Sequence, residues 1–511
     1  MLRKIKPATL CFGILSGILL NLPFSTGNLW VFAWIGFLPL FFALQNKKPL
    51  AAFLISFFTG IVFWTLTVFW LIHVTLIGLV LLVLYLALYF GLFGLIISSS
   101  SLVLRPSSFV FFIPALWVIL EYLWAHLLTG FGWAFLGYSQ YLNLPVIQIA
   151  DITGVYGVSF LVMMVNVTIW RLLIETRGQK SVTRKIWIHS LVAGFWLLVS
   201  VTYGFFRLHQ KIEGRHLRVS VIQGNIPQEL KWMPGAQGFI LDRYIRLTES
   251  ASSDSPDLVV WPESSSPGFL GEDDWVFQRI SDLARRIKIP ILIGTVVVED
   301  RKYFNSAVLM DKSGEITRRY DKLHLVPFGE YVPLKKIFSF LETVVPIGDF
   351  TAGKEYTLFQ LPITYDLSPV NFGVLICFED TVSELSRNFV KRQADFLVNI
   401  TNDGWYKQTP AAYQHLSASV FRALENRIPL VRSANTGVSC FIDSNGRITS
   451  RVLKDNKDIF VDGFKTQMIT LNKTVSIYRN IGDLFVLSCF ALAIFYGIII
   501  KLKVRLSAFK H

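Results

Sequence analysis

The stretch FGVLICFEDT, residues 372–381, joins an apolar run to a cysteine and two acidic residues. The run FGVLIC predicts a buried strand, and the following TVSELSRNFVKRQ predicts a helix. Thr381 and Glu384 have the spacing of a capping box, which places the expected helix start near Thr381. Cys377 is therefore expected in the turn between a strand and a helix.

Cys377 has three interpretations: a core side chain, half of a disulfide with Cys440, or a nucleophile. Free cysteines usually behave as small hydrophobic residues. A disulfide is conceivable in an oxidising compartment, but both cysteines lie in apolar runs and pairing would consume the nucleophile. A position just ahead of a helix N-terminus lowers the pKa of a thiol. Glu379 and Asp380 oppose this effect, so a nucleophilic Cys377 needs a nearby cation.

Two other segments supply partners for a nucleophile. Lys322 lies in YDKLHLVPFGEYVP, and Glu263 follows a short apolar strand in DLVVWPES. A nucleophilic thiol needs a base for its proton and a donor for the developing oxyanion. Spacing alone does not show that these residues meet Cys377. His324 and His415 raise the alternative of a Cys-His dyad, but neither has a supporting pattern.

Residues 209–482 differ in composition from the rest of the chain. Continuous apolar strands bounded by turns alternate there with amphipathic helices near 274–287 and 410–427. Such strands are typical of sheets buried on both faces, in α/β or layered α-β-β-α folds. The expected strands lie in LRVSVIQGNI, DLVVWPES, PILIGTVVV, NFGVLICFED, ADFLVNITND and IPLVRSANTGVSCFID.

The remaining sequence is that of a membrane protein. The 511-residue chain is 53% hydrophobic and only 16% charged. A spanning helix needs about 20 mostly apolar residues. The first apolar run resembles a signal peptide, but a second run follows at once and no cleavage signal is evident, so we expect it to be retained. Eight spans are predicted, at 8–24, 28–45, 51–71, 76–104, 108–128, 156–174, 186–206 and 483–501.

The positions of Lys and Arg predict the orientation, because short cytoplasmic loops collect these residues. With the N-terminus inside, the outer loops near 22–27, 72–75 and 129–155 contain neither residue type. Both termini are then cytoplasmic and residues 209–482 are periplasmic. The same distribution explains much of the net charge of +14 without nucleic acid. The predicted cytoplasmic segments hold Arg3, Lys4, Lys6, Lys47, Lys48, Arg105, Arg171, Arg177, Lys180, Arg184, Lys185, Lys501, Lys503, Arg505 and Lys510.

Three further features have open interpretations. The four cysteines lack metal-type spacing, so neither a metal site nor a cofactor is predicted. Glu121, in the fifth predicted span, either serves function or braces the helices. Residues 332–350 are unusually apolar, with Lys335 and Lys336 beside aromatic residues. We expect this segment to be a lid on the bilayer surface rather than a loop packed on its own domain.

Three motifs carry a family resemblance. WPES with Glu263, YDKLHLVPFGEYVP with Lys322 and GVLICFED with Cys377 look like the motif blocks of the nitrilase, or carbon–nitrogen hydrolase, superfamily. NITNDGWY and RALENRIPLVRSANTG resemble the segments that follow the cysteine there. With its predicted spans, and with QGNIPQELKW and EYLWAHLLTGFGWAFLGYSQ, nearly the whole chain resembles the apolipoprotein N-acyltransferase family.

This resemblance implies an α-β-β-α nitrilase-like domain, inserted before the last helix of an eight-helix transmembrane bundle. It implies that Glu263 is the general base, Lys322 the oxyanion stabiliser and Cys377 the nucleophile. One departure is Phe378, where the family often has a tyrosine; its ring should still pack. The residues expected to support the site are Glu330, Glu379, Tyr331, Asn305 and Trp232.

The resemblance also implies an activity. The expected enzyme moves an acyl chain from a phospholipid to the N-terminal amine of a diacylglyceryl-modified apolipoprotein, as a monomer in the bacterial inner membrane. The expected domains are seven helices in 1–208, the catalytic domain in 209–482, and the eighth helix with its tail in 483–511. Two alternatives are a membrane-tethered amidase acting on a small amide, and a transporter or receptor with an inactive domain.

Overall fold

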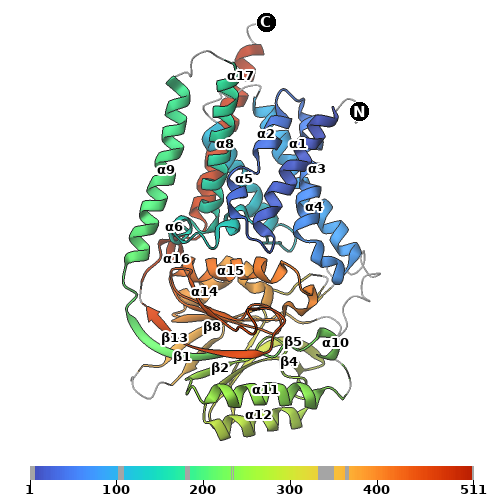
Figure 1. The fold of residues 1–511 in the computed structure, drawn as a ribbon, viewed down its shortest axis with the longest axis vertical. Coiled ribbons are helices and arrows are strands. Elements are labelled where there is room, and N and C mark those ends of the chain that lie inside the picture. Colours follow the sequence, from blue (N-terminus) through green and yellow to red (C-terminus); the bar gives the residue numbers. More distant parts are fainter. Residues whose placement is uncertain are drawn as a thin grey trace. The chain divides into compact units, whose positions relative to one another are not determined.

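The structure, a computed structural model, divides the chain into two compact units. Unit 1 comprises residues 1–209 and 480–511, and unit 2 comprises residues 210–479. The described part of unit 1 is built from helices, whereas unit 2 contains both β-sheets (Figure 1). The structure describes residues 6–101, 109–178, 184–231, 233, 235–327, 329–331, 350–362, 368–472 and 474–508.

Apolar helices make up unit 1. Among the described residues, five stretches are long and apolar enough to cross a membrane: 7–24, 49–67, 76–100, 155–174 and 190–209. These match the first, third, fourth, sixth and seventh predicted spans, while the total of eight remains a prediction. The longer helices are α1 (Pro7–Asn21), α3 (Pro49–Thr67), α4 (Leu76–Ser101), α5 (Phe109–His126), α8 (Val155–Gly178), α9 (Arg184–His209) and α17 (Leu484–Ala508).

The second predicted span, 28–45, is wrong as a single helix. It consists of η3 (Trp30–Trp34) and α2 (Leu38–Leu44), with a break between them. The break leaves backbone groups that the side chain of buried Asn166 on α8 satisfies: its Oδ1 accepts from the Phe37 N–H at 3.0 Å, and its Nδ2 donates to the Ala33 carbonyl at 2.8 Å. Irregular backbone is tolerated at membrane depth only when protein groups satisfy it in this way.

A second buried polar side chain in unit 1 is Glu121 on α5. It accepts hydrogen bonds from Trp117 Nε1 at 2.8 Å and from the Leu136 backbone N–H at 2.7 Å. Leu136 begins the short helix η6 (Leu136–Gln140), in the predicted outer loop. These contacts favour the bracing interpretation of Glu121, since the carboxylate fixes the loop to the helix.

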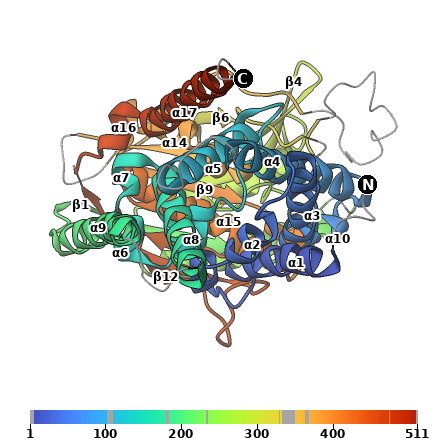
Figure 2. The ribbon, with the colours of Figure 1, turned by 90° about the horizontal axis from the view of Figure 1, so that it is seen from above.

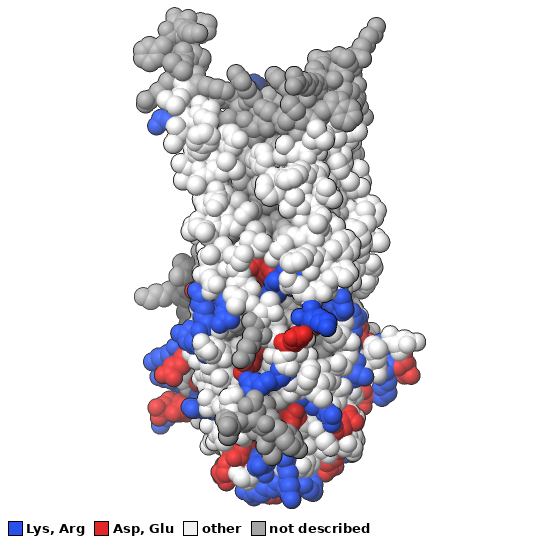
Figure 3. Space-filling view, turned by 90° about the vertical axis from the view of Figure 1, so that its left-hand side faces the viewer, with Lys and Arg blue, Asp and Glu red and all other residues white. Residues whose placement is uncertain are grey.

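The surfaces of the two units differ in charge. The visible face of unit 1 shows almost no Lys, Arg, Asp or Glu, whereas unit 2 carries both signs over its visible face (Figure 3). Seen along the helices, α3 lies beside α1 and α9 beside α6 (Leu144–Ile147) and α8 (Figure 2). The nearly uncharged visible face agrees with a membrane environment for unit 1.

Two mixed sheets form the centre of unit 2. The seven-stranded sheet has the order β13-β1-β2-β4-β5-β6, with β3 paired to β4, and the six-stranded sheet has the order β12-β11-β10-β9-β8-β7. The first sheet contains β1 (Gly214–Gln223), β2 (Leu258–Val260), β3 (Phe269–Leu270), β4 (Ile291–Glu299), β5 (Lys302–Met310), β6 (Ile316–Asp321) and β13 (Gly463–Asn472). The second contains β7 (Leu358–Leu361), β8 (Val370–Ile376), β9 (Phe396–Thr401), β10 (Leu430–Ala434), β11 (Cys440–Ile442) and β12 (Ile448–Arg451).

Helices cover the outer face of each sheet. α11 (Gln237–Ser252) and α12 (Asp274–Ile287) pack on the first sheet, and α14 (Ser383–Lys391) and α15 (Ala411–Asn426) pack on the second (Figure 1). The inner faces meet: the Ser433 hydroxyl of β10 lies 3.0 Å from the carbonyl oxygen of Ile222 on β1. The predicted α-β-β-α layering is therefore confirmed, and the expected helices at 274–287 and 410–427 are present. Because both faces of each sheet are covered, the strands read as continuous apolar runs.

One glycine tests the packing of the second sheet. A Cβ at Gly373 of β8 would lie 2.5 Å from Phe389 Cγ of α14, whereas a Cβ at Gly238 of α11 would meet nothing within 4 Å. We expect Gly373→Ala to destabilise the fold by about 1–3 kcal/mol through overpacking. Gly238→Ala should be neutral or stabilising, by up to about 1 kcal/mol, because alanine favours a helix. Thermal unfolding of the full-length protein in detergent measures both, and equal melting temperatures would contradict this account.

Candidate active site

Glu263, Lys322 and Cys377 lie just after the ends of strands from both sheets. Glu263 lies three residues after β2, Lys322 directly follows β6, and Cys377 directly follows β8. Lys322 Nζ is 3.7 Å from Glu263 Oε1. The charges of Glu263 and Lys322 both act on the pKa of Cys377, so the three side chains lie within electrostatic range of one another.

A second carboxylate completes a buried hydrogen-bond network. Glu330 Oε1 lies 2.9 Å from Lys322 Nζ. Asn305 Nδ2 donates to Glu263 Oε1 at 2.8 Å and to Glu330 Oε1 at 2.7 Å, which bridges the two acids. Burial by itself would lower the pKa of Lys322, but the carboxylates of Glu330 and Glu263 outweigh it and raise that pKa. Lys322 is therefore a fixed cation, and Asn305 and Glu330, two of the expected supporting residues, contact Glu263 and Lys322.

Cys377 occupies a strained turn. Its φ is +54°, in the left-handed region that non-glycine residues rarely adopt. It is the first residue of η8 (Cys377–Thr381) and its side chain is largely buried. Strained conformations of this kind cost about 1–3 kcal/mol and persist only when the surroundings fix them. The turn therefore depends on the contacts around it.

The predicted capping box is wrong. α14 begins at Ser383 without a side-chain cap, and the Thr381 hydroxyl donates instead to the Phe378 carbonyl at 2.8 Å. Burial and the charge of Glu263 raise the pKa of Cys377, while Lys322 lowers it. The net direction is thus opposite to the lowering that a helix N-terminus can produce. Ionisation of the thiol must rely on proton transfer to a base and on nearby cations.

Glu379 fixes the turn from one side. Its fully buried carboxylate accepts hydrogen bonds from the Ile376 N–H at 2.8 Å, the Leu323 N–H at 2.7 Å and the Tyr320 hydroxyl at 3.0 Å. Burial raises the pKa of Glu379 to about 7, against the effect of these donors. Because Leu323 follows Lys322 and Ile376 precedes Cys377, Glu379 ties two site segments together.

The other predicted supporting positions differ in outcome. Tyr331 follows Glu330 and is partly buried, and burial raises its pKa. The Phe378 ring packs 6.1 Å from the ring of His324, so the expected packing is confirmed. Trp232 lies outside the described residues. So do residues 332–349 of the predicted lid, while Phe350 donates its N–H to the Glu330 carbonyl at 2.8 Å.

Lys231 was missed by the sequence analysis. It ends the short helix α10 (Gln228–Lys231), where no periodic pattern marks it. Its side chain is 6% exposed, and Nζ donates to the carbonyl oxygens of Glu263 at 3.2 Å and Ser264 at 3.1 Å. Burial lowers the pKa of Lys231 to about 8, while Glu263 and Cys377 act in the opposite direction. The site thus contains a second buried amine that fixes the turn carrying Glu263.

The cysteines are free. Cys377 and Cys440 form no disulfide with each other, and neither do Cys11 and Cys489. Within the described ranges, no cluster of His, Cys, Asp and Glu has the arrangement of a metal site.

The chain matches two family models. Residues 16–168 match the apolipoprotein N-acyltransferase N-terminal domain, and residues 218–470 match the carbon-nitrogen hydrolase domain. A carbon–nitrogen hydrolase from Helicobacter pylori aligns with 53% of this chain and 94% of its own, at 17% identity and a TM-score of 0.40. The family model, which spans nearly all of unit 2, defines it as a carbon–nitrogen hydrolase domain.

Relatives extend over both units. The apolipoprotein N-acyltransferase of Geobacter metallireducens is 40% identical over 497 residues, covering 94% of this chain and 92% of the relative. That of Pasteurella multocida is 33% identical and covers 88% of each chain. The chain belongs to the apolipoprotein N-acyltransferase family.

Glu379→Gln tests the junction between the site segments. The substitution keeps the shape but turns an acceptor oxygen into a donor, which then faces a backbone N–H. We expect a loss of stability of about 1–3 kcal/mol from the unsatisfied donors and slower alkylation of Cys377. Glu384→Gln, at an exposed position on α14, is the control and should change stability by less than about 0.5 kcal/mol. Equal melting temperatures for the two variants would show that the Glu379 carboxylate does not hold the two site segments together.

The pH dependence of the stability of Lys231→Met tests whether burial lowers the pKa of the Lys231 amine. A folded pKa near 8, below the ordinary value of 10.5, penalises the charged form in the folded protein. The penalty is present below pH 8 and disappears as pH rises to 10.5, so the native protein gains stability across that window. The melting temperature of Lys231→Met minus that of the native protein should therefore fall from pH 8 to pH 10.5. A constant difference would contradict the assignment.

Proposed function

We propose that this protein transfers an acyl chain from a phospholipid to the α-amine of the diacylglyceryl cysteine at the N-terminus of apolipoproteins. The observation that carries the proposal is a buried Glu263, Lys322 and Cys377 cluster in a chain whose relatives carry the name apolipoprotein N-acyltransferase over most of its length. A membrane-bound enzyme with a nucleophilic thiol suits two lipid substrates.

In the first half-reaction, Glu263 takes the proton of the Cys377 thiol as the sulfur attacks the ester carbonyl carbon of the phospholipid. Lys322, a fixed cation, stabilises the oxyanion that forms. The C–O bond to glycerol then breaks, and Glu263 returns its proton to the departing alkoxide. The products are a thioester on Cys377 and a lysophospholipid, with atoms and charge balanced.

In the second half-reaction, the neutral amine of the acceptor attacks the thioester carbonyl carbon. Glu263 takes a proton from the amine, the C–S bond breaks, and the proton returns to the Cys377 sulfur. The product is an amide on the lipoprotein, and the enzyme regains its starting state. Covalent catalysis of this kind splits one difficult transfer into two easier steps.

The supporting residues have roles that follow from their contacts. Asn305 and Glu330 orient Glu263 and Lys322, because Asn305 bridges both carboxylates and Glu330 contacts the lysine. Lys231 fixes the backbone of the Glu263 turn. Tyr331 and Trp232 are proposed to line the substrate path, and residues 332–350 to form the lid on the bilayer. No cofactor is needed for acyl transfer by this route.

The proposed setting is the bacterial inner membrane. Seven spans in 1–208 and an eighth in 483–511 would leave both termini in the cytoplasm and the catalytic domain, 209–482, in the periplasm. The distribution of Lys and Arg along the sequence supports this orientation, and the weakly charged surface of unit 1 supports a lipid environment (Figure 3). The working form is proposed to be a monomer.

The thioester is the direct test. Purified full-length protein, incubated with phospholipid alone, should gain the mass of an acyl chain that hydroxylamine removes. Cys377→Ala should gain none, whereas Cys440→Ala, which removes another buried free cysteine, should gain it normally. Intact-mass spectrometry measures the adduct. No adduct on the folded native protein, together with hydrolysis of small amides, would favour the amidase alternative.

Glu263→Gln tests the proposed general base while leaving the Cys377 nucleophile in place. A glutamine keeps the hydrogen-bonding shape but accepts no proton, so thioester formation should slow by about 10²–10⁴-fold. Single-turnover mass spectrometry gives the rate. An unchanged rate would remove Glu263 from the role of general base.

A further inference from the structure

A buried ionic cluster lies directly behind the Cys377 turn. Its members are Asp380 on η8, Asp403 on η9 (Asp403–Tyr406), His415 on α15 and Arg432 on β10, each at most 1% exposed. Arg432 contacts Asp380 Oδ2 at 2.9 Å and Asp403 Oδ2 at 3.3 Å. None of these side chains belongs to the proposed Glu-Lys-Cys machinery. Burying four ionisable groups is costly unless they are paired and hydrogen-bonded.

Both ring nitrogens of His415 lie close to oxygen atoms that accept hydrogen bonds. Nδ1 lies 2.8 Å from Asp403 Oδ1, and Nε2 lies 3.2 Å from the backbone carbonyl oxygen of Cys377. Nε2 is also 2.9 Å from Asp380 Oδ1. Carboxylate and carbonyl oxygens only accept, so both nitrogens must carry hydrogen and the ring is an imidazolium. With His415 charged, the two acids and two bases of the cluster balance.

The pKa of His415 agrees with this geometry. Burial alone would lower it, but the carboxylates of Asp380 and Asp403 outweigh burial and the repulsion of Arg432, and the pKa rises to about 9. A ring that keeps its second proton at neutral pH cannot accept one from the thiol. The Cys-His dyad considered from the sequence is therefore not what this histidine provides.

The hydrogen bonds from this region to Cys377 go to its backbone carbonyl. The Cys377 carbonyl oxygen accepts from His415 Nε2 and also from Asn399 Nδ2, at 3.2 Å. Asn399 is oriented in turn by Arg432, whose Nη1 donates to Asn399 Oδ1 at 2.6 Å. Two side chains of one charged network thus fix the carbonyl of the residue that has a φ of +54°.

We propose that His415 is a positioning residue, whose Nε2–H fixes the Cys377 carbonyl and thereby orients the thiol, with Asn399 as the second donor. This inference rests on the proposed role of Cys377 as nucleophile. Glu379 restrains the turn from the side of Leu323, and the cluster restrains it from the side of α15 and β10. A left-handed residue restrained on both sides presents its side chain in one direction.

Two variants of His415 separate positioning from fold stability. An asparagine amide reaches about as far as Nδ1, so His415→Asn keeps the Asp403 contact and loses the Cys377 carbonyl. A glutamine amide reaches about as far as Nε2, so His415→Gln can still donate to that carbonyl. Both variants remove the same charge. Glu425→Gln is the matched control, because it breaks the buried Arg422–Glu425 pair on the same helix without touching Cys377.

The readout is alkylation of Cys377 by iodoacetamide in full-length protein, located by peptide mass and expressed per folded molecule. We expect His415→Asn to slow alkylation at least about tenfold, since displacement of a reacting group by about 1 Å can cost about 10²-fold. His415→Gln should retain most of the native rate, and Glu425→Gln all of it. Equal rates in the two His415 variants would overturn the proposal.

Asn399→Ala provides a second test if the histidine variants do not fold. It removes the other donor to the Cys377 carbonyl without changing the net charge, and it should also slow alkylation of Cys377. An unchanged alkylation rate per folded molecule would overturn the proposal. Alkylation needs no lipid substrate. If native protein forms no thioester with phospholipid, the proposed function fails, while the contrast between His415→Asn and His415→Gln still decides the positioning role.

Discussion

The left-handed conformation of one residue, Cys377, is the constraint on which the structure of unit 2 around the site depends. A left-handed turn between β8 and η8 is costly for a cysteine, and several buried polar groups serve to maintain it. Glu379 accepts backbone hydrogen bonds on one side, and His415 and Asn399 donate to the carbonyl on the other. These contacts come from both sheets and from α15, so the position of the thiol depends on the assembled four-layer fold.

In the same unit, the protonation of buried ionisable side chains depends on burial and on the charged groups beside them. Lys322 lies between two carboxylates, which raise its pKa, while burial lowers the pKa of Lys231. The thiol itself is disfavoured as an anion by burial and by Glu263. In the proposed mechanism, this thiol ionises as Glu263 takes its proton.

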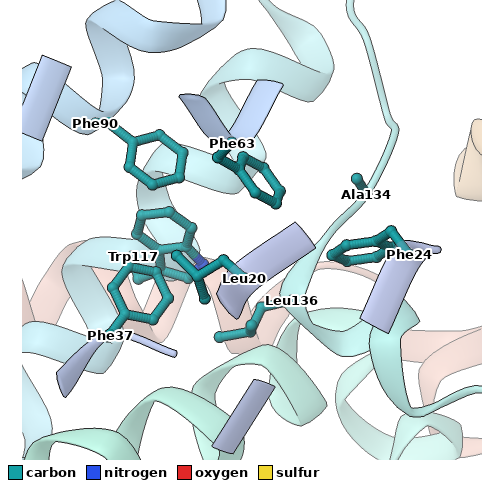
Figure 4. Close-up of a pocket in the computed structure, with 8 residues that line it drawn as sticks. All are labelled: Leu20, Phe24, Phe37, Phe63, Phe90, Trp117, Ala134 and Leu136. Atoms are coloured by element: carbon teal, nitrogen blue, oxygen red, sulfur yellow. The ribbon is translucent and has the colours of Figure 1, made fainter. Parts of the chain in front are cut away.

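In unit 1, too, buried polar side chains stabilise irregular stretches of backbone. Asn166 and Glu121 satisfy backbone groups where helices break or loops fold back, and aromatic side chains fill the space between them. A small cavity in this unit is lined almost entirely by apolar and aromatic side chains, with Trp117 and Phe37 in edge-to-face contact (Figure 4). The cavity lining is Leu20, Phe24, Phe37, Phe63, Phe90, Trp117, Ala134 and Leu136. Polar contacts thus define the path of the chain, and aromatic packing fills the interior.

The sequence by itself determined the apolar strands, two of the principal helices, most of the long apolar spans and the presence of three motifs, but not that these motifs meet. Apolar runs and motif residues are local signals, readable wherever the neighbours along the chain decide the outcome. It failed where neighbours in space matter: the interruption of the segment 28–45 is satisfied by Asn166, 129 residues away, and Thr381 bonds Phe378 instead of capping α14. Lys231 and His415 carry no local pattern. Only the tertiary structure gave them roles, because a buried charge is defined by the partners that the fold brings to it.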